Sequence, residues 1–203
     1  MNTKEILSTP RVIAVIFSTS LITTSLITTS LIAIMPHTLL AQSAPTNLLT
    51  YQNSTAGIKL QYPSNWVKQE NGTRQDTQTD LVTFTPSTIN SNASLDITVD
   101  DITDSPGTTL AQYASDEIGS LKQQFANNDF KLIESKSSII LAGLPAYRIV
   151  YTSVDQNTTT KDTEIGAIKG GKVYLLTYEA GPNEYDKYLP IALKMIDSFK
   201  LIK

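Results

Sequence analysis

The chain has 203 residues, of which 40% are hydrophobic and 17% charged, and its formal net charge is −3. It contains no cysteine and a single histidine, His37, so disulfides, thiolate nucleophiles, iron–sulfur clusters and zinc–thiolate sites are excluded. An acidic chain also lacks the charge that neutralises phosphates, and we expect no nucleic-acid partner.

The first predicted element is the uncharged stretch of residues 12–35, which follows the mildly basic residues 1–11. Its Leu-Ile pairs recur every five residues, and a helical rotation of about 100° per residue spreads them around the helix, which suits lipid on all sides. The stretch is long enough for a membrane span of about 20 residues. Small residues around Ala41–Ala44 also fit a signal-peptidase site. We therefore predict export, with residues 1–41 as a signal peptide or an N-terminal membrane anchor.

Removal of the N-terminal segment would leave a chain without histidine or cysteine, with 14 basic and 18 acidic residues. Ser-His-Asp and Cys-His catalysis and histidine-ligated metals are then excluded. Residues 42–47 read as a polar linker, and residues 48–203 as one domain.

Alternating apolar and polar residues predict strands in the first half of this domain. We expect them at 48–51, 57–62, 81–85 and 95–99. Pro63 should end the second strand because it has no N–H to donate. Trp66, the only tryptophan, is expected to anchor the core, since a tryptophan buries roughly 150–250 Å². Residues 68–80 are polar and contain the turn signal Asn71-Gly72, so we expect a loop there.

The second half is predicted to begin with a helix whose apolar residues recur at steps of three and four. This stripe comprises Leu110, Ala114, Ile118, Leu121 and Phe125. Further strands are expected at 130–134, 138–141, 146–154, 164–168 and 173–178, with a hairpin turn at Gly170-Gly171. A last helix should cover 185–199. The fold class is therefore α+β, a central antiparallel sheet of about six to eight strands flanked by two main helices in an α/β/α sandwich.

The ordered elements resemble the PsbP family and, more broadly, the Mog1/PsbP-like fold. The resemblance is carried by Gly57–Trp66, Gly143–Tyr151, Gly171–Tyr178 and Met195–Phe199, and it spans residues 48–203. It implies a central antiparallel sheet with helices on its faces. These segments are apolar or turn-forming, so they are markers of the fold and contain no catalytic set.

The same resemblance implies roles for relatives in photosynthetic organisms. There, family members are extrinsic photosystem II subunits that help to retain calcium and chloride, and some bind manganese or zinc through histidine. The predicted domain has no histidine, so that metal role does not carry over. Residues 42–47 are also uncharged, in contrast to the basic N-terminal arm of the plant proteins.

One acidic cluster, Asp96, Asp100, Asp101 and Asp104, offers oxygen ligands of the kind that calcium prefers. Its spacing matches no EF-hand, and Asp96 is expected on the solvent face of a strand. The preferred interpretation is a solvated strand end, with weak calcium binding as the alternative. We expect no catalytic residues and no cofactor.

Four Asn-x-Ser/Thr sequons are candidates for glycosylation in an exported protein. They are Asn53, Asn71, Asn92 and Asn157, and all fall in or near predicted loops.

The function that this pattern favours is an exported, non-enzymatic binding or accessory domain. It would engage a protein partner or a small ligand outside the cytoplasm, with membrane contact through residues 12–35 if these are retained. The alternatives are an extrinsic photosystem II subunit with a calcium-related role, an extracytoplasmic hydrolase that uses carboxylates, and a membrane-associated stress protein of the same fold.

Overall fold

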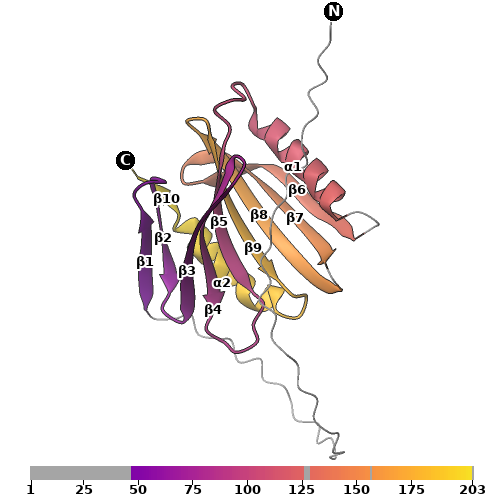
Figure 1. Ribbon diagram of the computed structural model, residues 1–203. Coiled ribbons are helices and arrows are strands. Elements are labelled where there is room, and N and C mark those ends of the chain that lie inside the picture. Colours follow the sequence, from indigo (N-terminus) through magenta and orange to yellow (C-terminus); the bar gives the residue numbers. More distant parts are fainter. Residues whose placement is uncertain (1–46, 126–128, 156, 203) are drawn as a thin grey trace, which may run out of the picture. The chain divides into compact units, whose positions relative to one another are not determined.

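The computed structural model describes residues 47–125, 129–155 and 157–202, which form ten strands and two helices (Figure 1). The strands of the first half are β1 (Leu48–Asn53), β2 (Ile58–Pro63), β3 (Trp66–Gln75), β4 (Gln78–Pro86) and β5 (Ser94–Asp101). Those of the second half are β6 (Phe130–Leu141), β7 (Leu144–Asp155), β8 (Thr158–Lys169), β9 (Lys172–Ala180) and β10 (Lys200–Leu201). The helices are α1 (Leu110–Gln124) and α2 (Tyr185–Asp197). The predicted α+β class is confirmed.

The strands form two antiparallel sheets. The larger has seven strands in the order β3-β4-β5-β9-β8-β7-β6, and the smaller has three in the order β1-β2-β10. Both hairpins expected from the turn residues are present. Tyr51 pairs with Leu60 in β1–β2, and Gly170 and Gly171 connect β8 to β9 with φ of 60° and 74°. Positive φ at both turn residues is what a two-residue type I′ turn requires.

The two helices cover opposite faces of the large sheet, as neighbouring residues of β8 show. The Thr163 hydroxyl is hydrogen-bonded to the hydroxyl of Tyr185 on α2. Glu164, the next residue, points to the other side and interacts with Glu117 of α1. Because successive side chains of a strand alternate between faces, the face of α1 and the face of α2 contain different residue sets.

The face of α2 contains the main apolar core. Residues of β5 and β9 on this face are buried, and α2 buries Tyr185, Tyr188, Ala192, Met195 and Ile196 against them. Trp66 is 3% exposed, and its ring meets Tyr188 edge to face at 6.1 Å between centroids. Its predicted role as an anchor of the core is confirmed, because a buried aromatic pair of this kind adds stability beyond its buried area.

The face of α1 differs from the prediction. The expected stripe placed Leu110, Ile118 and Phe125 toward the sheet, but these three are only half-buried. The helix instead buries Tyr113, Ala114, Glu117 and Leu121. The predicted rotation of α1 about its own axis is therefore wrong by part of a turn. The sheet surface below α1 is polar, so the helix packs a tyrosine and a glutamate against it.

Three further segments differ from the sequence-based expectation. Residues 68–80 are not a loop, because β3 continues through Asn71-Gly72 as a bulge, with Gly72 at φ 64°, and turns only after Gln75. The two short strands expected within 130–141 are the single strand β6. The pairing of β10 with β2, which gives the small sheet its third strand, was not predicted.

The predicted signal peptide or anchor at residues 1–41, with its uncharged stretch at 12–35, lies outside the described residues, as does most of the linker at 42–47. Among the described helices, neither is both long and apolar enough to cross a bilayer.

Candidate functional site

The aspartates singled out in the sequence do not meet at one point. Asp96 and Asp100 share the α1 face of β5, whereas Asp101 points to the opposite face and Asp104 lies exposed in the following loop. Asp101 Oδ1 accepts two hydrogen bonds from Thr103, at 3.1 Å from its N–H and 2.6 Å from its hydroxyl. These bonds lower the pKa of the Asp101 carboxyl and bind it to its own loop.

The expectation that this strand face is solvated is wrong. Asp100 is completely buried, and Asp96 is half-buried. Asp100 is buried because α1 packs on this side of the sheet. Tyr113 of α1 donates a hydrogen bond of 2.8 Å to Asp100 Oδ2.

Several more carboxyl groups join these two on the α1 face. We call the set the acid layer, and it comprises Asp96, Asp100, Glu117, Asp162, Glu164 and Glu179. The layer draws on β5, β8, β9 and α1, and Asp162 and Glu164 are each only 2% exposed. No lysine or arginine among the described residues forms an ion pair with Asp96, Asp162, Glu164 or Glu179.

Glu164 lies at the centre of the acid layer. The hydroxyl of Tyr147 on β7 donates a hydrogen bond to Glu164 Oε1, and this bond favours the charged carboxylate. Burial acts in the opposite direction and is the largest influence, followed by the charge of Glu117. Together they raise the pKa of Glu164 to about 8. A carboxyl group of this kind holds its proton at neutral pH.

Asp162 and Glu179 are cross-strand neighbours on β8 and β9 and share a hydrogen bond. Burial, with the charge of Asp96, raises the pKa of Glu179 to about 7, and burial beside Glu179 raises the pKa of Asp162. A glycosidase needs its two carboxyls roughly 5 to 9.5 Å apart to admit sugar or water between them. A pair that is hydrogen-bonded to itself leaves no such space, so this geometry does not favour the hydrolase alternative.

The carboxyls also do not converge on a common centre. Within residues 47–125, 129–155 and 157–202, no group of three or more His, Cys, Asp or Glu side chains is placed to hold a metal ion. The calcium hypothesis for the aspartates gains no geometric support from the described residues.

The other face of the sheet carries a groove. An open groove of about 760 Å³ lies on the α2 side, where the turn between β6 and β7 meets the end of α2 and β10. Its apolar lining consists of Ile139, Ile140, Leu141, Ile165, Leu193, Ile196, Phe199 and Leu201. Its charged lining consists of Arg148, Asp197 and Lys200. A volume of this size lies within the usual range of ligand sites, roughly 300–1,000 Å³.

The groove adjoins β6, which is the last strand of the large sheet and, among the described strands, pairs only with β7. Such an edge exposes backbone N–H and C=O groups on its outer side. Ile133 and Ile140 of this strand are 51% and 70% exposed. Ile140 also lines the groove, so the groove lies directly beside this sheet edge.

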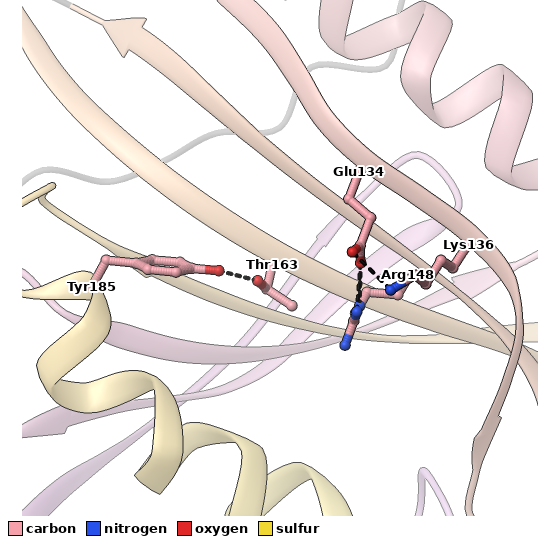
Figure 2. A network of polar contacts seen from close by, with 5 residues as sticks. All are labelled: Glu134, Lys136, Arg148, Thr163 and Tyr185. Atoms are coloured by element: carbon pink, nitrogen blue, oxygen red, sulfur yellow. Dashed lines mark hydrogen bonds and ion pairs between the residues drawn. The ribbon is translucent and has the colours of Figure 1, made fainter.

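Figure 2 shows the ion pairs that fix Arg148 beside this groove. Arg148 donates from Nε to Glu134 Oε1 at 2.8 Å, and Lys136 Nζ lies 2.9 Å from Glu134 Oε2. Hydrogen bonds from Lys136 and Arg148 hold the pKa of the Glu134 carboxyl below its ordinary value. One carboxylate thus orders two cations, of which Arg148 lines the groove. Thr163 and Tyr185 connect the same face to α2 (Figure 2).

The four sequons occupy different environments. Asn53 Oδ1 accepts from the Ala56 N–H, and Asn92 Oδ1 accepts from the Gly181 N–H at 3.1 Å. Asn71 lies within β3 rather than in a loop, and Asn157 is exposed in the turn between β7 and β8. Their use as glycosylation sites stays a prediction.

Sequence reasoning missed the buried carboxyls Glu117, Asp162 and Glu164 and the half-buried Glu179. The signal for two of them was visible, since Thr160, Asp162 and Glu164 alternate along β8. Alternating polar residues ordinarily indicate a solvated face, and nothing local distinguishes a wet face from one that a helix covers. The groove was also missed, because its lining comes from segments that are far apart in the chain.

The profile of a family described as PsbP-like protein matches residues 12–201. No curated protein sequence matches the chain.

Three solved structures are similar in fold. Cyanobacterial PsbP (CyanoP) from Synechocystis sp. PCC 6803 has 14% identity and a TM-score of 0.58, with 79% of this chain and 95% of that chain covered. The Ran-binding protein Mog1p of Saccharomyces cerevisiae has 10% identity and a TM-score of 0.53, covering 77% and 96%. LpqN of Mycobacterium tuberculosis, involved in cell envelope biogenesis, has 14% identity and a TM-score of 0.50, covering 72% and 83%.

Proposed function

The chain belongs to the PsbP-like protein family, and from that premise we propose that it is an exported, non-enzymatic accessory domain that binds a protein partner outside the cytoplasm. The observation that carries the proposal is the apolar groove beside the free edge of β6. An extended segment of a partner can add to an exposed sheet edge through its backbone while its side chains enter neighbouring pockets. The groove supplies the pocket and β6 supplies the edge.

The arrangement of the carboxyl groups on the α1 face also supports a binding role over a catalytic one. The buried carboxyls lie below α1, on the face opposite the groove, and the Asp162–Glu179 pair is closed by its own hydrogen bond. Among proteins of the same fold, Mog1p is a Ran-binding protein, so the fold is compatible with protein binding.

Export is the second part of the proposal, and it is supported by the uncharged stretch at residues 12–35. N-terminal sequencing of the protein isolated from its source should find either a start between Gln42 and Pro45 or an intact, membrane-bound N-terminus. Full-length protein that is soluble in the cytosol would contradict export.

Binding at the groove is tested by affinity capture from extracytoplasmic and membrane extracts with the full chain and two single variants. Ile140→Asp places a charge at the groove, where the side chain is already 70% exposed. Ile89→Asp is the matched control, because Ile89 is 87% exposed and does not line the groove. We expect one partner to be retained by the wild type and by Ile89→Asp, and its recovery to fall about tenfold with Ile140→Asp. Equal recovery by all three would show that the groove is not the binding surface.

A further inference from the structure

The two helices are held against the sheet by different kinds of side chain. Of the residues that α2 buries, all are apolar or aromatic. The residues that α1 buries are Tyr113, Ala114, Glu117 and Leu121, so α1 buries a carboxyl group, which α2 does not. The packing of α1 therefore depends on the state of the polar groups below it in a way that the packing of α2 does not.

Apart from Glu164 itself, the ionisable groups of the acid layer, and those that interact with them, come from several neighbouring elements. They are Tyr113 and Glu117 of α1, Asp96 and Asp100 of β5, Tyr147, Tyr151 and Asp155 of β7, Asp162 of β8, Glu179 of β9, and Asp80 of β4 at the far side of Asp96. All of these are carboxyls or phenols. The cations beside them are Lys122 of α1 and Lys136 of β6, which line a groove with Tyr147 and have exposed side chains.

Charge in this layer is costly for two physical reasons. A carboxylate removed from water loses solvation, and a second carboxylate nearby repels it. Both apply to Glu164, which is buried and interacts with Glu117 on the helix itself. Ionisation of Glu164 therefore places a negative charge directly against the buried carboxyl group of α1.

We propose that α1 is a pH-sensitive element of the fold, which stays docked on the sheet while the acid layer holds its protons and loosens as the layer ionises. The Tyr147–Glu164 and Tyr113–Asp100 hydrogen bonds define the docked state. Loosening exposes the layer to water, which solvates the new charges. The device is separate from the groove, which lies on the other face of the sheet.

The size of the effect follows from the proton affinity of Glu164 in the two states. With a pKa of about 8 when docked and the ordinary value of about 4.5 when solvated, the equilibrium constant for docking falls roughly a hundredfold between pH 5.5 and pH 8.5. Asp162 and Glu179 act in the same direction, because burial raises the pKa of each of them.

Hydrogen exchange of the full chain, followed by mass spectrometry at pH 5.5 and pH 8.5, tests this inference. After correction for the intrinsic pH dependence of exchange, the amides of residues 110–124 should lose about a hundredfold in protection at the higher pH. The amides of β9, in the centre of the sheet, should lose much less. Glu164→Gln keeps the shape and the acceptor for Tyr147 but cannot ionise, so its α1 should stay protected at pH 8.5. Glu134→Gln removes a half-buried carboxyl on the opposite face and should behave as the wild type.

If Glu164→Gln does not fold, the hydrogen-exchange protection of wild-type α1 at the two pH values still tests the proposal. Unchanged protection of α1 between the two pH values would overturn the proposal. So would an equal loss of protection in α1 and β9, because that result describes global unfolding rather than loosening of one helix. A folded Glu164→Gln variant that loses protection like the wild type would also overturn it.

Discussion

Stability of the whole domain should fall as pH rises from 5 to 8, and Glu164 should account for a large part of the loss. Its pKa in the folded state is about 8, against an ordinary value of 4.5. A carboxyl whose folded pKa is raised contributes stability that is fully present below the unfolded pKa and is lost as pH rises through the folded pKa. The relevant window for Glu164 is therefore pH 4.5 to 8.

The magnitude follows from the same two values. Glu164 alone should lower the free energy of unfolding by about 3 kcal/mol between pH 5 and pH 8. Glu179 titrates in the same window, with a folded pKa of about 7, but the two carboxyls belong to one interacting layer, so their contributions do not simply add. Carboxyls with a lowered pKa, such as Asp101 and Glu134, act with the opposite sign. These two carboxyls stabilise the fold above their unfolded pKa, and this stabilisation is lost as pH falls through their folded pKa. That loss occurs below the window of pH 4.5 to 8.

Urea unfolding of the full chain at pH 5, 6, 7 and 8, followed by tryptophan fluorescence, measures this directly. The wild type should lose about 3 kcal/mol or more across the series, and Glu164→Gln should lose clearly less. The difference between the two proteins isolates the contribution of Glu164 from that of every other titrating group. Stability that is constant or rises with pH in the wild type, or an identical decline in the variant, would refute the reasoning.

Three other outcomes are expected. Trp66→Ala should destabilise the domain by roughly 3–5 kcal/mol in a thermal melt, and Trp66→Phe by less, because the larger cavity loses more contacts. An unchanged melt would remove Trp66 from its anchoring role. Gly166→Ala should lower the free energy of unfolding by about 1–3 kcal/mol, since a Cβ there would lie 2.4 Å from the buried ring of Tyr147. Gly119→Ala in α1 should be neutral or stabilising in the same thermal assay, because a Cβ there meets nothing within 4 Å. Calorimetric titration should find no stoichiometric zinc site of micromolar affinity, because the chain has no cysteine and only His37; such a site would reopen a metal-handling role.

The parts of the fold that were predictable from sequence are those decided by neighbours along the chain. Gly170-Gly171 directs a two-residue hairpin because both residues adopt positive φ without strain. The alternation in β2 and β5 reflects strand geometry, and the apolar face of α2 reflects helical periodicity. Residues 68–80 were mistaken for a loop because edge strands are often polar, and β3 is an edge strand whose exposed face carries no hydrophobic signal.

The sequence by itself therefore determined the α+β class, the order of most elements, the burial of Trp66 and the absence of thiol and imidazole chemistry from the described domain. Whether a polar strand face meets water or a helix was decided only by the tertiary structure, because that depends on which distant segment lies across it. In the sequence, Glu164 has the pattern of an ordinary solvated residue, and only the packing of α1 places Glu117 close to it. The groove was equally invisible, since it exists only where the β6–β7 turn, α2 and β10 come together.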